Sequence, residues 1–321
     1  MAKIGLIGVG KWGINHLKSL SGLECELVGI SDTNQEKKSV ADEYDIKFFT
    51  DYRELLKVVD AVTVVVPTDL HYKIAKDCLE LGKHLLIEKP ITTKSEQAKE
   101  LVKIAEDKGL ILSVGYLYRF NNSIKRLKEL MEEIGEIQYI TCRYMHSTKP
   151  PRKDSGVILN LGIHPMDILN FITDRRPLKV YSKKKNQISE QFEDSAMIVL
   201  DYGDFFATIE VSCCHPEKKR DMWIIAEKEK IYVDYFEQKI VRYPLKVSYE
   251  KIEKEEPVEE SITKNESLKD ELEYFIQSVD KKNAEGISNT LNIGKEEYYT
   301  TRICELSIKS AETRKEMALH D

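Results

Sequence analysis

KIGLIGVGKWG, residues 3–13, is the stretch that decides the fold of the first half of the chain. Lys3–Ile7 is an apolar run of strand length, and a helix is expected to start at Gly13. Between them, Gly8, Gly10 and Gly13 match the pattern G-x-G-x-x-G in the strand–turn–helix context that the pattern requires. Gly8 allows a tight turn, Gly10 lets a pyrophosphate approach the backbone, and Gly13 lets the helix pack on the strand. We therefore predict a dinucleotide-binding turn, with a purely structural strand-to-helix turn as the alternative.

An alternation of strands and helices continues from this turn to about residue 118. The run Ala61–Val66 is continuously apolar and rich in β-branched residues, which is typical of a strand buried on both faces of a parallel sheet. The alternation predicts a Rossmann-type doubly wound parallel sheet in residues 1–119. The expected strands are 3–7, 26–31, 61–66, 84–87 and 110–115, and the expected helices are 13–20, 34–44, 70–81 and 93–108.

The second half, residues 120–321, has a different pattern. Strand-like segments follow one another from residue 137 to 145 and again from 180 to 243, and Tyr202–Asp204 has the composition of a hairpin turn. Helices are expected at 123–134, 158–172, 268–279 and 296–315. This half is therefore predicted to be an α+β domain with a large, mostly antiparallel, open-faced sheet. The boundary between the two domains is expected near Tyr118–Asn121.

The composition of the chain argues against several classes of binding partner. The chain has 321 residues, with 49 Lys and Arg against 55 Asp and Glu, so its net charge of −6 does not favour nucleic acid as a partner. No apolar run approaches the length of a membrane span, and we expect neither a membrane anchor nor a secretory signal. The six cysteines are dispersed apart from Cys213–Cys214, which favours reduced thiols, a cytoplasmic location and the absence of a bound metal.

Asp32 ends the second expected strand, 24 residues after Gly8. A carboxylate at this position can accept hydrogen bonds from the adenosine ribose, and it would repel a 2′-phosphate. The stretch that follows contains no arginine, although Lys37 and Lys38 are present. We therefore favour NAD over NADP; the alternative is that Asp32 is a helix-capping or turn residue.

The fourth expected strand ends in Glu88-Lys89-Pro90. In a doubly wound sheet, ligands bind beyond the carboxyl ends of the strands. A lysine beside the cofactor and substrate is partly desolvated, which suits it to proton transfer or to hydrogen bonding with a reacting hydroxyl. Glu88 could orient Lys89 or contact the nicotinamide ribose. The alternative is a solvated strand end.

Four stretches together resemble the Gfo/Idh/MocA oxidoreductase family: GVGKWG (8–13), VVVPTDLHYKIAKDCLELGKHLLIEKP (64–90), VGYLYRFN (114–121) and GVILNLGIHPMDIL (156–169). The resemblance implies a Rossmann domain for the cofactor, followed by a substrate-binding domain whose open sheet forms a homodimer or homotetramer. It also implies hydride transfer between a sugar or cyclitol carbinol and NAD(P), with Lys89 as a catalytic residue. The residues expected to contact the cofactor are Gly8, Gly10, Lys11, Trp12, Gly13, Asp32, Pro67, Thr68, His71, Glu88 and Lys89.

NLGIHPMD, residues 160–167, resembles the second signature of the family, D-x-G-x-H-x-x-D. Asn160, His164 and Asp167 are spaced to share one face of a helix. The resemblance makes His164 the catalytic group that takes the hydroxyl proton, with Lys89 bound to the same oxygen. Asn160 stands where the family usually has aspartate and cannot supply its charge, so Lys89 and His164 are the expected working pair. Asp167 could orient His164 instead.

Three stretches are most similar to the UDP-N-acetylglucosamine 3-dehydrogenase group of this family: RFN (119–121), PPR (150–152) and CCHPEKKRDMWIIAEKEKIYVDYFEQKIVRY (213–243). That group oxidises C3 of a UDP-linked N-acetyl sugar. The alternatives are a dehydrogenase of a free sugar or cyclitol such as inositol, and a dinucleotide-binding regulator without catalysis. The expected substrate contacts are Tyr118, Arg119, Asn121, Arg152, Asn160 and His164, with salt bridges or core packing as the structural alternatives.

Overall fold

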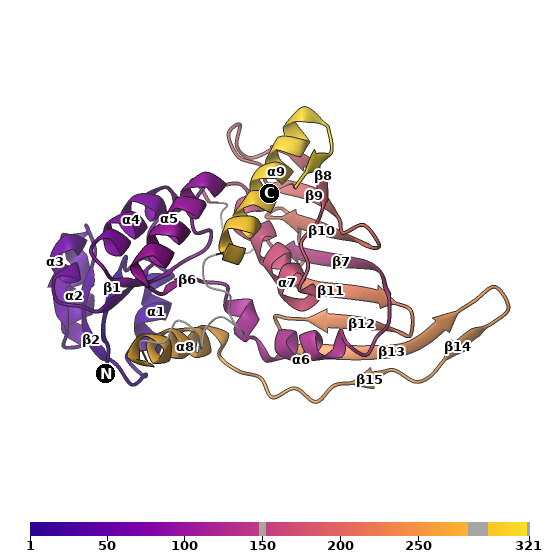
Figure 1. Ribbon diagram of the computed structural model, residues 1–321, viewed down its shortest axis with the longest axis horizontal. Helices are drawn as coiled ribbons and strands as arrows, with labels where there is room; N and C mark the ends of the chain where they lie inside the picture. The colour runs from indigo at the N-terminus through magenta and orange to yellow at the C-terminus, as the bar shows by residue number, and fades with distance from the viewer. Residues whose placement is uncertain (148–151, 282–294, 320–321) are drawn as a thin grey trace. The chain divides into compact units, whose positions relative to one another are not determined.

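A computed structural model describes residues 1–147, 152–281 and 295–319 of the chain (Figure 1). It divides into two compact units. The first unit comprises Met1–Leu117 and Glu266–Thr301, and the second comprises Tyr118–Asn265 and Arg302–Asp321.

The first unit contains a six-stranded sheet in the order β3-β2-β1-β4-β5-β6. Every pair of neighbouring strands is parallel, which confirms the predicted doubly wound sheet. β3 was not predicted, because its three residues, KFF, are too few to show a periodicity. The strands are β1 (Lys3–Ile7), β2 (Glu26–Ser31), β3 (Lys47–Phe49), β4 (Ala61–Val64), β5 (His84–Ile87) and β6 (Leu112–Val114).

Helices of the first unit include one that comes from far along the chain. α8 (Ser267–Lys281) packs beside α1 (Gly13–Leu20), as Figure 1 shows. It buries Leu272, Phe275, Ile276 and Val279 in the same core as Leu17 and Leu20. The division expected from the sequence, 1–119 and 120–321, therefore differs from that of the structure, which returns α8 to the first unit. The others are η1 (Gln35–Lys37), α2 (Lys38–Glu43), α3 (Tyr52–Leu56), η2 (Thr68–Leu70), α4 (His71–Glu80) and α5 (Ser95–Lys108).

The second unit contains one large sheet in the order β14-β13-β12-β11-β7-β10-β9-β8-β16, with β15 beside β13. β7 and β10 run parallel and the other pairs are antiparallel, which confirms the predicted mostly antiparallel sheet. The strands are β7 (Ile137–Met145), β8 (Lys179–Lys185), β9 (Ser195–Asp201), β10 (Phe206–Ser212), β11 (Lys219–Ala226), β12 (Glu229–Asp234), β13 (Lys239–Val247), β14 (Ile252–Lys254), β15 (Val258–Glu259) and β16 (Met317–Ala318).

Helices cover one face of this sheet (Figure 1). The side chains of β7 alternate, so that Ile140, Cys142 and Tyr144 are buried while Tyr139 lies on the opposite face and stacks on Phe206. The segment predicted as one helix over 158–172 begins as a turn of π-helix, η4 (Ile158–Gly162), which is wider than an α-helical turn. The other helices are η3 (Leu117–Phe120), α6 (Asn122–Leu130), α7 (Ile163–Thr173) and the end of α9 (Lys295–Thr313).

Candidate functional site

The glycine-rich turn between β1 and α1 has the backbone that its sequence predicts. Gly8 has a φ of +91°, and a Cβ atom there would lie 2.4 Å from the carbonyl oxygen of Val65. A Cβ atom at Gly13 would lie 2.1 Å from the carbonyl oxygen of Gly8, so neither position accepts a side chain. A Cβ atom at Gly10 would meet nothing within 4 Å and would project into open space. The turn therefore fits a phosphate group held against its backbone.

Asp32 lies directly beside this turn. Its Oδ2 atom accepts a hydrogen bond of 2.8 Å from the backbone N–H of Val9, and its Oδ1 atom accepts one of 2.9 Å from that of Asn34. These bonds hold the carboxylate against the turn; a contact of Asp32 with the ribose of a dinucleotide stays a prediction. Lys11 and Trp12 are exposed at the tip of the turn.

Glu88 connects the glycine-rich turn to the end of β5. Its Oε1 atom accepts hydrogen bonds from Nε1 of Trp12 at 2.6 Å and from Nε2 of His16 at 3.0 Å. Its Oε2 atom accepts from the backbone N–H of Lys89 at 3.2 Å. Because a carboxylate only accepts hydrogen bonds, Nε2 of the fully buried His16 carries a proton. His16 was not predicted, although its i, i+4 spacing from Trp12 is the signal that would have pointed to it.

The network around Glu88 sets its charge. Burial alone would raise the pKa of Glu88, but the hydrogen bond and charge of His16, with help from Lys89 and Trp12, hold that pKa below its ordinary value. The carboxylate is therefore ionised at neutral pH. A charged Glu88 fixes both the start of α1 and the backbone at Lys89.

We expect Glu88→Gln to make the stability of the first unit less dependent on pH in the acidic range. A carboxyl whose pKa is lowered by folding stabilises the protein above about pH 4.3, and this contribution disappears as the pH falls through the lower folded value. At pH 7 the variant should lose about 1 to 3 kcal/mol of stability. Urea unfolding between pH 3 and 7 measures how steeply the free energy of unfolding changes with pH, and the variant of an exposed residue, Glu24→Gln, is the control. The same pH dependence in both variants would contradict a lowered pKa of Glu88.

The remaining predicted cofactor contacts lie at the same edge of the sheet. Lys89 is half-buried and directly follows β5. Pro67 and the buried Thr68 follow the end of β4, and His71 starts α4. The Nδ1 atom of His71 lies 2.7 Å from the carbonyl oxygen of Pro90, and its Nε2 atom lies 3.0 Å from that of Val66. His71 therefore ties the segment after β4 to the segment that carries Lys89.

In the second unit, His164 lies in an aromatic cluster. Its ring stacks on Tyr144 at 5.0 Å between centroids and meets the edge of Tyr118 at 5.3 Å. The two tyrosine hydroxyls lie 3.3 Å apart, and Nη1 of Arg220 donates a hydrogen bond of 3.0 Å to Tyr118. Burial raises the pKa of Tyr144 well above its usual range, so its hydroxyl stays protonated. Tyr144 and Arg220 were not predicted, because they reach His164 from β7 and β11 through a strand register that the sequence does not specify.

Arg119 and Asp167 form a buried ion pair. The Nε atom of Arg119 lies 3.1 Å from each carboxylate oxygen of Asp167, and Nη2 donates a further hydrogen bond. Asp167 is 1 % exposed and Arg119 is 7 % exposed. The pair joins η3 to α7, the helix that carries His164, so Asp167 holds Arg119 in place. The role of Arg119 toward a substrate stays a prediction.

Asn121 is the N-cap of α6. Its Oδ1 atom accepts hydrogen bonds from the N–H and hydroxyl of Ser123, at 3.0 and 2.6 Å, and its Nδ2 atom donates to the carbonyl oxygen of Tyr235 at 3.0 Å. These contacts give the side chain a structural role. A contact of Asn121 with substrate stays a prediction.

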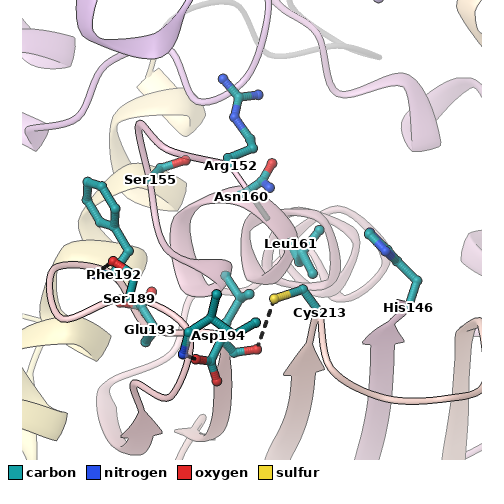
Figure 2. Close-up of a pocket in the computed structure, with 12 residues that line it drawn as sticks. His146, Arg152, Ser155, Asn160, Leu161, Ser189, Phe192, Glu193, Asp194 and Cys213 are labelled. Atoms are coloured by element: carbon teal, nitrogen blue, oxygen red, sulfur yellow. Dashed lines mark hydrogen bonds between the residues drawn. The ribbon is translucent and has the colours of Figure 1, made fainter. Parts of the chain in front are cut away.

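Asn160 and Arg152 line a cavity in the second unit (Figure 2). The cavity has a volume of about 50 Å³, and its wall is formed by η4, the loop before it and the segment 188–194. Arg152 pairs with Asp154, its Nε atom lying 2.7 Å from Oδ1. The two prolines of the PPR stretch, 150 and 151, lie outside the described residues.

Within 1–147, 152–281 and 295–319, no group of three or more His, Cys, Asp or Glu side chains is placed to hold a metal ion. No helix in these ranges is long and apolar enough to cross a membrane.

The sequence matches two family models. Residues 2–116 match GFO_IDH_MocA, described as an oxidoreductase family with an NAD-binding Rossmann fold. Residues 124–232 match GFO_IDH_MocA_C3, described as the GFO/IDH/MocA C-terminal domain. The two matches together cover more than half of the chain.

Individual relatives differ in their substrates. UDP-N-acetylglucosamine 3-dehydrogenase of Acidithiobacillus ferrooxidans is 33% identical over 179 residues, 56% of either chain. Inositol 2-dehydrogenase of Rhizobium meliloti is 27% identical over 187 residues, 56% of this chain and 57% of that protein. The chain thus aligns with little more than half the length of these curated relatives. The solved structure of the Acidithiobacillus enzyme superimposes with a TM-score of 0.86 at 25% identity, over 97% of this chain and 98% of that one.

Proposed function

Because the chain belongs to the Gfo/Idh/MocA oxidoreductase family, we propose that it is an NAD-dependent dehydrogenase of a sugar carbinol. The proposed reacting position is C3 of a UDP-linked N-acetyl sugar. The observation that supports this substrate is the similarity to the Acidithiobacillus UDP-N-acetylglucosamine 3-dehydrogenase, in sequence and over nearly the whole length of its structure.

We propose that the first unit holds the dinucleotide. The backbone of Gly8–Gly13 would bind its phosphates, and Asp32 its adenosine ribose, with Pro67, Thr68, His71 and Glu88 at the same sheet edge. When bound, NAD accepts the hydride. The carboxylate of Asp32 beside the turn would repel a 2′-phosphate, which supports NAD over NADP.

We propose that Lys89 and His164 handle the proton of the reacting hydroxyl. As the carbon gives up its hydride, the hydroxyl O–H bond breaks and an imidazole nitrogen of His164 takes the proton. The Nζ atom of Lys89 donates a hydrogen bond to the same oxygen and stabilises the charge that develops there. The rings of Tyr118 and Tyr144 on two sides of His164 keep the imidazole from turning.

We further propose a cytoplasmic homodimer or homotetramer that uses the uncovered face of the large sheet. That face carries Tyr139 stacked on Phe206, and Trp223 packed against Tyr232 and Tyr243. Aromatic side chains gathered on one sheet face are typical of an interface between subunits.

The test is the absorbance of reduced nicotinamide with purified protein. We expect turnover with NAD and UDP-N-acetylglucosamine or its uronic acid, and a lower kcat/KM with NADP. Inositol 2-dehydrogenases among the relatives support a second candidate, oxidation of a free cyclitol. Activity on myo-inositol without activity on UDP-sugars would replace the first proposal by the second. Dinucleotide binding without turnover of any substrate would favour a regulator.

A further inference from the structure

We propose that the cavity beside Asn160 receives the acylamino group on C2 of the sugar. The proposal rests on the proposed function, which places the reacting hydroxyl on C3. The two carbons are bonded to each other, so their substituents leave from neighbouring positions of the ring. A group on C2 must then bind next to the residues that act on C3. Asn160 lines this cavity, and His164 follows it on the continuous helix of η4 and α7.

The size of the cavity matches a small substituent. About 10 to 15 Å³ of such space accommodates one water-sized group. The cavity volume of about 50 Å³ therefore holds a handful of non-hydrogen atoms. The nitrogen, carbonyl group and methyl group of an acetamido substituent fill this space, whereas a nucleobase or a second sugar ring does not fit.

One wall offers a hydrogen bond that the protein itself does not use. Ser155 is 6 % exposed, and its Oγ atom has no hydrogen-bond partner among the described residues. Ser155 lines the cavity on the same side as Asn160 (Figure 2). A buried hydroxyl without a partner is costly, and the carbonyl oxygen of an amide would accept its hydrogen bond.

The rest of the wall does not favour an anion, because it is largely apolar or acidic and the guanidinium of Arg152 is already paired with Asp154. Val157, Leu161, Ile188 and Phe192 offer apolar surface for a methyl group. Glu193 and Asp194 are both buried in the wall. The negative charge of these two side chains opposes a phosphate or a carboxylate.

The two wall carboxylates are already bound by the protein backbone. Glu193 accepts a hydrogen bond of 3.0 Å from the N–H of Ile158, and Asp194 accepts from the N–H groups of Gln187 and Ile188. A neutral amide therefore fits the cavity better than the diphosphate of the substrate. A free amine is the competing occupant, since it would be attracted by the carboxylates.

The decisive experiment compares kcat/KM for UDP-N-acetylglucosamine, UDP-glucose and UDP-glucosamine. We expect the acetamido substrate to exceed each of the others by at least about tenfold, since they leave Ser155 unsatisfied and the apolar wall empty. Ser155→Ala should reduce this preference roughly fivefold to tenfold, the equivalent of one hydrogen bond. Ser195→Ala, which removes a serine hydroxyl bonded to Ser212 outside the cavity wall, is the control and should not alter the preference.

Cavity size is tested without any change to the protein. Replacing the N-acetyl group of the substrate by N-butanoyl should lower kcat/KM at least about tenfold, because the longer chain exceeds the available space. Equal rates with UDP-glucose and UDP-N-acetylglucosamine, or an unchanged preference in Ser155→Ala, would overturn the proposal while leaving the proposed function intact. A preference for UDP-glucosamine would assign the cavity to an amine. Absence of turnover with every UDP-sugar would overturn both this proposal and the proposed function.

Discussion

Replacing Lys89 by alanine is expected to lower kcat by about a thousandfold, while the dissociation constant for NAD changes by less than about threefold. Positioned proton donors and acceptors contribute on the order of 10²- to 10⁴-fold to rate, and Lys89 also stabilises the developing oxyanion in the proposed mechanism. Cofactor binding should persist, because the backbone of Gly8–Gly13 and the carboxylate of Asp32 are the groups proposed to hold the phosphates and the adenosine ribose of NAD. Stopped-flow absorbance of reduced nicotinamide gives kcat, and calorimetric titration gives the NAD affinity.

The control for this variant is Lys73→Ala. Lys73 is exposed on α4 in the same unit, and its loss removes the same charge from the protein. It should leave both kcat and NAD binding unchanged. Turnover in Lys89→Ala within tenfold of the wild type would remove Lys89 from the catalytic pair. Loss of NAD binding together with turnover would instead assign Lys89 to the cofactor site.

Arg119→Met is expected to destabilise the second unit by about 3 to 5 kcal/mol. The substitution keeps most of the side-chain volume but removes the guanidinium that pairs with the buried carboxylate of Asp167. Breaking a buried pair by removing one partner costs this much, because the remaining charge is neither solvated nor neutralised. The midpoint of urea unfolding, followed by circular dichroism, should fall accordingly.

Two further variants test whether the loss of stability in Arg119→Met comes from the buried charge of Asp167 or simply from removing an ion pair. In Arg119→Met/Asp167→Leu neither charge remains, so much of the lost stability should return. Lys179→Met breaks the exposed pair with Glu316 and should have a far smaller effect. If Arg119→Met proved no more destabilising than Lys179→Met, the ion pair would have no special energetic role.

The first unit was predictable from sequence because its signals are local. A turn that needs glycine at three fixed positions, an apolar strand such as Ala61–Val66, and helices ending at glycine each identify themselves within a few residues. α8 was predicted as a helix, but the predicted division placed it in the second domain, whereas it packs in the core of the first unit. Amphipathicity shows that Leu272 and Phe275 are buried, yet it does not show against which sheet.

The site in the second unit was less accessible to prediction. The family signature identifies His164, whereas Tyr144 and Arg220 are brought to it by the pairing of β7 with β11, which depends on contacts distant in sequence. The π-helical turn at Ile158–Gly162 has the same apolar pattern as an α-helix, so periodicity could not distinguish them. The cavity beside Asn160 depends on Glu193 and Asp194, which no motif marks.

The return of α8 to the first unit has a consequence for the order in which the protein is made. Domains usually fold during synthesis in the order in which they leave the ribosome. Here all six strands of the first sheet have been synthesised once Val114 is reached. The core that they share with α8 cannot be completed until Val279 has emerged from the ribosome. The sheet of the second unit, apart from β16, is translated before that core can close. A gene fragment ending at residue 119 would therefore encode a sheet with exposed apolar surface, and an isolated first unit requires residues 266–301 to be joined to it.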